Sequence, residues 1–319
     1  MTLPPGLAVR QAADEADFAF IMALAHQEQW NPGVRDAVLF SRTDPDGFFI
    51  ATLDGKPVGC ISAVSYGPSF GFIGLYIIAT EHRGKGFGIA LWNRAMSHLA
   101  SHRTIGLDGV VAQEPNYRKS GFVTAYRDLR YMGLQFPAPP SLPESTAIVP
   151  LDQVHIDDLV TFDARYFSVP RKRFLENWVE QAPDMHGVAL LNNAASSGGG
   201  RIRAYGVIRQ SATGYRVGPL FAQDSGSARV VLLRLIQLAR SATAASSPSS
   251  SSSSGTMSED PLSSSLPVFL DAPDTNPAAA ELLQGLGMKV VFECARMYHG
   301  PAPEVDMDGI FATTTLALG

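Results

Sequence analysis

The chain has 319 residues, which is long enough for about two domains with sizeable cores. Hydrophobic residues make up 45% of it and charged residues 17%, a balance typical of a globular protein. The formal net charge is -5, the pI is about 5.8, and the lysine and arginine residues are scattered. Nucleic acids and anionic membranes require clustered positive charge, so the composition argues against both as partners.

The N-terminal segment lacks the layout of a signal peptide, and the longest apolar run, 70–79, is too short to span a bilayer. We therefore predict a cytoplasmic protein that contacts no membrane. Cys60 and Cys294 are the two cysteines of the sequence, and neither belongs to a CxxC motif. The sequence therefore predicts buried thiols, with no disulfide framework and no metal site.

The first 134 residues alternate short strands and helices. Asp14 is the predicted N-cap of the first helix, and Asp54-Gly55 is a strong signal for a two-residue hairpin turn. The predicted elements are strand 7–12, helix 14–29, helix 34–41, strands 48–53, 58–66 and 70–78, a helix that includes 90–99, and strands 104–111 and 122–132.

The stretch 75–96 reads as a strand, a glycine-rich turn and a helix, with glycines at 84, 86 and 88. Glycine lets the backbone approach a ligand closely, and the first amides of a helix have no partners within it. Such a turn binds anions such as pyrophosphate. It is not a P-loop, because Lys85 lies outside the spacing GxxxxGK[ST]. A dinucleotide fingerprint fails at its third glycine, where Ile89 stands.

The hexapeptide 83–88 reads R-x-x-G-x-G, and 117–122 reads Y-x-x-x-G-F, one helix and one strand later. Both resemble motifs of the GCN5-related N-acetyltransferase (GNAT) superfamily. The resemblance implies acetyl-CoA as co-substrate, with its pantetheine arm between two splayed strands, one ending at Ile78 and the next starting at Thr104. The implied cofactor-binding residues are Ile77, Ile78, Arg83, Gly84, Lys85, Gly86, Phe87, Gly88 and Ile89.

The resemblance also implies catalytic residues. Tyr117 lies where family members carry a tyrosine that protonates the departing thiolate, although an ordinary packed aromatic is the alternative. The segment between Val111 and Tyr117 is shorter than usual in the family. Asp108, in an otherwise apolar strand, is the candidate general base, and a structural carboxylate or a water relay are the alternatives.

The loop region that covers the acceptor site in this family corresponds to Trp30, Asn31 and Asp36, which are candidate substrate contacts. For each of them a packed tryptophan or a solvated polar side chain is an equally good interpretation.

A proline-rich linker, 135–146, leads to a second series of strands and helices over 147–300 that weakly repeats the first. The segment 222–227, at the place of the phosphate loop, lacks R-x-x-G-x-G and contains an acid, whereas 276–288 resembles the second GNAT motif. We predict a degenerate GNAT-like domain. The serine-rich segment 241–265 is a predicted disordered insertion, and 301–319 is a C-terminal tail.

The predicted fold class is α/β (α+β), with two tandem GNAT folds, each a mixed, mostly antiparallel sheet flanked by helices. The predicted activity is direct transfer of an acetyl group from acetyl-CoA to the primary amine of a small molecule, in a ternary complex without a metal. Protein lysine as acceptor, or a non-catalytic acyl-CoA-binding regulator, are the alternatives. The sequence leaves the oligomeric state open.

Overall fold

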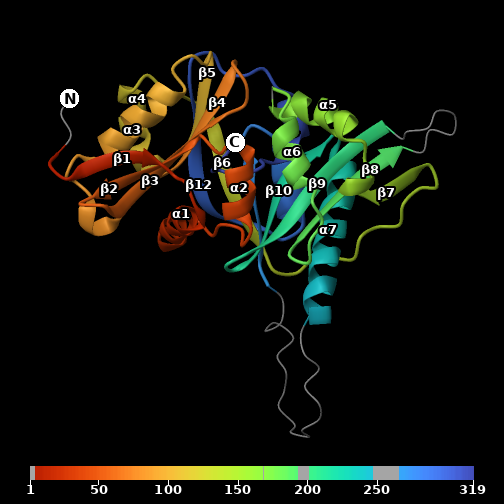
Figure 1. Ribbon diagram of the computed structural model, residues 1–319. Helices are drawn as coiled ribbons and strands as arrows, with labels where there is room; N and C mark the ends of the chain where they lie inside the picture. Colours follow the sequence, from red (N-terminus) through yellow and green to blue (C-terminus); the bar gives the residue numbers. More distant parts are fainter. Residues whose placement is uncertain (1–3, 168, 193–200, 247–265) are drawn as a thin grey trace, which may run out of the picture.

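The structure is a computed structural model that describes residues 4–167, 169–192, 201–246 and 266–319 (Figure 1). The described strands form a single 13-stranded sheet in the order β1-β2-β3-β4-β5-β12-β6-β11-β10-β9-β8-β7, with β13 paired to β10. Most pairs are antiparallel, and helices flank the sheet, so the predicted fold class is confirmed. No helix in the described part of the chain is long and apolar enough to cross a membrane.

We call residues 4–134 the first half of the chain. Its elements are β1 (Leu7–Gln11), α1 (Glu15–Gln27), α2 (Asp36–Thr43), β2 (Phe48–Leu53), β3 (Lys56–Ser65), β4 (Phe70–Ile78), a 3-10 turn (Thr80–His82), α3 (Phe87–His98), β5 (Thr104–Val110), a 3-10 turn (Val111–Gln113), α4 (Glu114–Lys119) and β6 (Val123–Gly133).

We call residues 147–319 the second half. From the strand that opens it, its elements are β7 (Thr146–Pro150), a 3-10 turn (Leu151–Gln153), α5 (Ile156–Phe167), α6 (Lys172–Trp178), β8 (Met185–Asn192), β9 (Arg201–Ser211), β10 (Gly214–Ala222), α7 (Ser225–Ser246), β11 (Val268–Pro273), α8 (Pro277–Gly285), β12 (Lys289–His299), a 3-10 turn (Met307–Gly309) and β13 (Ile310–Ala312).

Local signals in the sequence account for several element boundaries. Asp14 caps α1 by accepting a hydrogen bond from the amide of Asp17. Asp54 and Gly55 both have positive φ angles, +48° and +79°, as the predicted two-residue hairpin turn requires. α7 extends to Ser246, into the segment predicted to be disordered, because alanines favour helix and Thr243 bonds to Tyr215. The rest of that segment, 247–265, lies outside the described residues.

The two halves exchange strands at the centre of the sheet. β12, from the second half, lies between β5 and β6 of the first half and pairs antiparallel with both. β6 in turn pairs with β11 of the second half. The blue strand β12 is visible among the strands of the first half in Figure 1. As a result, side chains from both halves meet at this place in the sheet.

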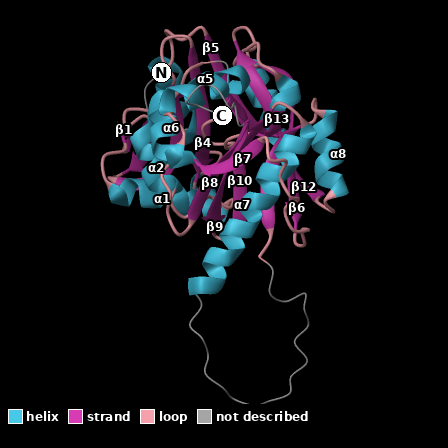
Figure 2. Ribbon diagram, turned by 90° about the vertical axis from the view of Figure 1, so that its right-hand side faces the viewer, coloured by secondary structure: helices cyan, strands magenta, loops and turns pink. Residues whose placement is uncertain are grey.

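Alternating side chains of the strands form cores on both faces of the sheet. On one face, α1, α2, α5 and α6 share a continuous hydrophobic core with strands of both halves. On the other face, α3 covers the first half, and α7 and α8 cover the second. Figure 2 shows α7 crossing the strands β8, β9 and β10. The large shared core holds the two halves together.

Residues 301–319, which we predicted as a tail, pack into the body of the protein. β13 pairs antiparallel with β10, and the amide of Thr313 donates to the carbonyl of Asp271 on β11. The segment then reaches the first half, where the hydroxyl of Tyr66 donates to the carbonyl of Leu318 over 2.9 Å. Its residues Thr313–Leu318 are largely buried, so the end of the chain is part of both cores.

Candidate active site

The gap between β4 and β5 is the central feature of the site. The two parallel strands pair only from Phe70–Ile73 to Thr104–Leu107, and β4 then continues to Ile78 without a β5 partner. Leu75 has a φ of +48°, and the pairing of β4 with β3 shifts register here, which marks a β-bulge. Backbone groups of β4 beyond Ile73 are therefore free of a ladder with β5 and face a cavity.

The cavity beside this gap has a volume of about 390 Å³. Its wall from the first half includes residues of α1, α2, β4, β5 and β6, and its wall from the second half includes residues of β9, β10, β12 and the C-terminal segment. Of the predicted site residues, those that line it are Trp30, Asp36, Ile77, Ile78, Arg83, Asp108 and Tyr117. The size lies within the range of small-molecule sites.

The glycine-rich turn adopts the conformation that an anion-binding loop needs. Gly84 and Gly86 have φ angles of +75° and +80°, and a side chain at either position would meet no described atom within 4 Å. Gly86 is the N-cap of α3, and no side chain in the described part of the chain bonds to this end of the helix. The first amides of α3 are thus available to an anion such as pyrophosphate.

The other residues of the turn have distinct surroundings. Arg83 donates to the carbonyl of Ile78 over 2.8 Å and pairs with Glu28 of α1, while Lys85 donates to the carbonyl of Glu81 over 2.7 Å. The remaining three are Phe87, which is buried, Gly88, where a Cβ would lie 2.5 Å from the Tyr76 hydroxyl, and Ile89, which is exposed.

The corresponding place in the second half is closed in two ways. Asp224 accepts hydrogen bonds from the amide and hydroxyl of Ser227, both over 2.8 Å, so an acid already occupies the start of α7. β13 pairs with β10 at Leu220 and Phe221, and Thr313 bonds to β11, so the chain itself fills the gap between β10 and β11. Among its described residues, the second half therefore has no open gap equivalent to the one beside β4.

Two phenols, Tyr117 and Tyr76, line the cavity next to each other on Trp92. The ring centroids of Tyr117 and Tyr76 lie 5.6 Å and 5.7 Å from that of Trp92. The Tyr117 ring also lies over Gly109, where a Cβ would approach it to 2.4 Å. Burial raises the pKa of Tyr117, and it raises that of Tyr76 to about 12, so both phenols are protonated at neutral pH.

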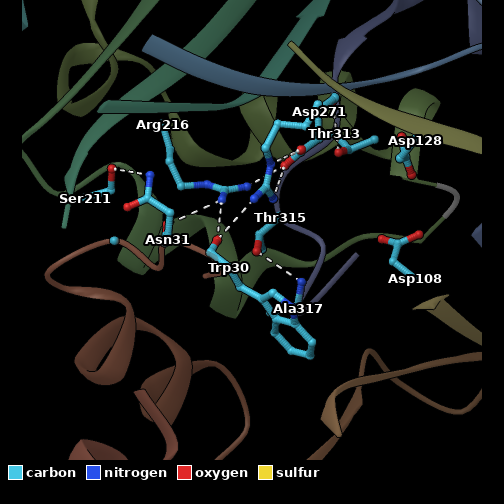
Figure 3. Close-up of polar contacts among 12 residues, drawn as sticks. Trp30, Asn31, Asp108, Asp128, Ser211, Arg216, Asp271, Thr313, Thr315 and Ala317 are labelled. Atoms are coloured by element: carbon cyan, nitrogen blue, oxygen red, sulfur yellow. Dashed lines mark hydrogen bonds and ion pairs between the residues drawn. The ribbon is translucent and has the colours of Figure 1, made fainter. Parts of the chain in front are cut away.

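Asp108 is held by an arginine from the other half. Arg296 of β12 lies opposite it in register and donates from Nε over 2.5 Å and from Nη2 over 2.7 Å to its two oxygens. Burial raises the pKa of Asp108, although Arg296 opposes this. Asp128 lies on the same side of the site (Figure 3), where its Oδ2 is 3.4 Å from Nη2 of Arg296, but its oxygens have no hydrogen-bond partner among the described residues. Burial and the charge of Asp108 raise its pKa well above the usual value.

We predict that Asp128→Asn stabilises the protein at high pH. When folding raises the pKa of a carboxyl group, the group makes its full contribution to the free energy of unfolding below its unfolded pKa. That contribution is lost as pH rises toward the folded pKa. Asparagine does not ionise, so the variant lacks this loss of stability at high pH. Its melting temperature should therefore rise by a few degrees above that of wild type at about pH 8 and barely change at about pH 4. Thermal denaturation across this range checks it.

Asp271→Asn is the matched control with the opposite sign. Burial would raise the pKa of Asp271, but Arg130 and Arg216 outweigh it and hold that pKa below the usual value. Its stabilising contribution is therefore present above the unfolded pKa, and the variant should lose stability at pH 8. Equal melting temperatures of Asp128→Asn and wild type at pH 8 would contradict a pKa of Asp128 that is raised by folding.

The three predicted substrate contacts take different positions. Trp30 lines the cavity, and its carbonyl accepts one hydrogen bond from Arg216 of the second half and one from Arg130 of the first. Asp36 also lines it, but its carboxylate is buried and pairs with Arg209 over 2.8 Å. Asn31 instead joins the two halves, since its side chain donates to Ser211 over 3.0 Å and accepts from the amide of Thr213 over 3.0 Å. It does not belong to the cavity wall.

The sequence analysis missed several residues of the cavity wall. Among them are the arginines Arg130, Arg209 and Arg216, of which only Arg216 stands out in the sequence, as the single charge of an otherwise apolar strand. Residues Thr315–Ala317 of the C-terminal segment also line the cavity, and no local pattern marked them. Within the described ranges, no group of three or more His, Cys, Asp or Glu side chains is arranged to hold a metal ion.

Two protein-family models match the chain. Residues 12–122 match the acetyltransferase (GNAT) family, and residues 159–252 and 261–312 match an acetyltransferase (GNAT) domain. The matches confirm the resemblance to tandem GNAT proteins that the motifs at 83–88 and 117–122 indicated.

Known proteins show the same relationship. Holothin acyltransferase of Pseudoalteromonas sp. (strain SANK 73390) is 31% identical over 92% of this chain and 88% of that protein. A putative acetyltransferase of Pyrococcus horikoshii has a similar fold, with a TM-score of 0.75 and 22% identity over 100% of this chain and 98% of that one. A tandem GNAT protein from the clavulanic acid biosynthesis pathway has a TM-score of 0.61 and 12% identity over 93% and 99%.

Proposed function

Because the chain belongs to the GNAT family of acyltransferases, which use acyl-CoA, we propose that it transfers an acetyl group from acetyl-CoA to the primary amine of a small molecule. The observation that carries the proposal is the open gap beside β4. It lies between the cavity and the start of α3, whose first amides have no side-chain cap. The turn at 84–88 would hold the pyrophosphate, and unpaired backbone groups of β4 would bind the pantetheine arm and polarise the thioester carbonyl.

Transfer is direct, in a ternary complex. Cys294 lines the cavity and is the nucleophile that a covalent route would use, but burial raises the pKa of its thiol, which disfavours the reactive thiolate. Burial likewise raises the pKa of Cys60, which does not line the cavity. The amine therefore attacks the thioester itself, and the C–N bond forms as the C–S bond breaks.

Tyr117 donates the proton that the departing thiolate needs, because it lines the cavity and is protonated at neutral pH. Asp108 is the candidate acceptor for the proton of the amine. The hydrogen bonds from Arg296 use one lone pair on each of its oxygens and leave others for a proton or a water molecule.

A small-molecule acceptor agrees with the shape of the site. Both halves and the C-terminal segment line the cavity, and a volume of about 390 Å³ suits a small ligand. A lysine on a protein surface would have to reach past these walls.

Thiol release tests the proposal. With acetyl-CoA and a panel of small amines, free coenzyme A should appear only when both an acyl donor and an accepted amine are present. A lysine-containing peptide serves as the comparison for the alternative acceptor. Thiol released in a burst without amine would contradict direct transfer, and binding of acetyl-CoA without thiol release from any amine would contradict the proposed reaction.

A further inference from the structure

Three buried arginines meet at one wall of the cavity. Arg130 comes from β6, Arg209 from β9 and Arg216 from β10, and their side chains are only 7%, 3% and 7% exposed. Arg209 and Arg216 lie directly opposite each other on neighbouring antiparallel strands. Like charges in such a pair repel each other, so the arrangement requires compensating negative charge.

The described residues supply less negative charge than this cluster needs. Asp271 pairs with both Arg130 and Arg216 (Figure 3), and Asp36 pairs with Arg209. Two carboxylates thus face three guanidinium groups. The remaining donors of Arg130 and Arg216 include Nη1 atoms that bond to the carbonyl of Trp30 over 3.2 Å and 2.9 Å, and a carbonyl brings no full charge.

One N–H donor group of Arg209 has no partner among the described residues. Its Nε and Nη2 donate to Asp36 over 2.8 Å and 3.4 Å, whereas its buried Nη1 has no hydrogen-bond partner among the described residues. An unpartnered buried donor on a charged group is costly, and a ligand anion would satisfy it. Burial, followed by the charge of Arg130, lowers the pKa of Arg216 to about 9.

The other charged groups that line the cavity are already balanced. Glu28 pairs with Arg83 near the glycine-rich turn, and Asp108 pairs with Arg296. Neither acid is therefore available to neutralise the arginine cluster. Between the cluster and the splayed strands, the wall is apolar, with Phe40, Phe292 and Leu107 among its residues.

We propose that the acceptor is an amine that carries a carboxylate, and that Arg209, with Arg216 beside it, binds this carboxylate. The proposal rests on the proposed acyl transfer and specifies its substrate class. One surplus positive charge matches a monoanion, and the planar fork of a guanidinium matches a carboxylate. A phosphate monoester would bring about two negative charges to the same place.

Binding and turnover test the proposal separately. Calorimetry measures binding of 4-methylbenzoate, hexanoate and their carboxamides to the acetyl-CoA-loaded protein. Steady-state kinetics compare 4-(aminomethyl)benzoate and 6-aminohexanoate with their carboxamides, whose amines lie far enough from the changed group to keep similar pKa values. At least one carboxylate should bind about 10-fold or more tightly than its carboxamide, the scale of a hydrogen bond to a charged group, and kcat/KM should show the same preference.

Arg209→Gln should reduce this preference to about one, because it removes the charge and the free donor. If the lone Asp36 destabilises that variant, Asp36→Asn/Arg209→Gln removes the pair together and preserves the shape of the site. Equal or undetectable binding of every carboxylate and carboxamide would overturn the proposal, as would a preference that survives in these variants. Turnover of neutral amines with no carboxylate preference would overturn it while leaving the acyltransferase proposal intact.

Discussion

A Gly86→Val variant is expected to fold and to lose acetyl-CoA binding. Gly86 is the N-cap of α3 with a φ of +80°, and a Cβ there would meet no described atom within 4 Å, so the side chain would project into the space proposed for the pyrophosphate. Several charge-assisted hydrogen bonds would be lost, which corresponds to a fall in affinity of about 100-fold or more. Calorimetric titration with acetyl-CoA measures it.

Valine at a positive φ also strains the backbone, and two further variants separate strain from obstruction. Gly67 in the β3–β4 turn has a φ of +83° and equally open surroundings, so Gly67→Val carries the same strain away from the cavity. It should lose stability and keep its affinity. Gly86→Asn tolerates the left-handed conformation yet still fills the space, so it should be stable and bind weakly. Unchanged affinity in Gly86→Asn would mean that this turn is not the pyrophosphate site.

The sequence predicted the features that depend on neighbouring residues. The Asp54–Gly55 hairpin turn, the Asp14 cap of α1 and the glycine-rich turn before α3 all follow from the conformational preferences of a few adjacent residues. The gap between β4 and β5 was implied by family resemblance, and the register of the two strands shows it.

The parts that the sequence did not predict depend on contacts between distant residues. Nothing local to β12 indicates that it lies between β5 and β6, and the partner of Asp108 follows only from that register, which places Arg296 opposite it. Residues 301–319 were predicted as a tail, yet β13 fills the gap beside β10. Arg216 was visible as a single charge within an apolar strand, but its position opposite Arg209 and the pairing of Arg209 with Asp36 depend on the fold.

A Tyr117→Phe variant is expected to bind acetyl-CoA as tightly as wild type and to turn over about 100-fold more slowly, the scale of a lost general acid. The change removes only the hydroxyl, so the ring keeps its contacts with Trp92 and Gly109, and stability should barely change. Single-turnover measurements with an accepted amine assign the loss to the chemical step. Because burial raises the pKa of Tyr117, the wild-type rate should show no fall from its ionisation between about pH 6 and pH 9.

Tyr76→Phe is the matched control, since Tyr76 lines the same cavity and packs on Trp92 at nearly the same distance. If Tyr117 is the acid, Tyr76→Phe should stay within about threefold of the wild-type rate, well short of the cost of a lost general acid. The reverse pattern, a slow Tyr76→Phe and a normal Tyr117→Phe, would transfer the role to Tyr76. The segment between Val111 and Tyr117 is shorter than usual in the family, and its length determines the position of the Tyr117 hydroxyl. Comparing the two variants therefore shows which of the two phenols reaches the sulfur. Normal rates in both variants would mean that neither phenol protonates the thiolate and that solvent does so.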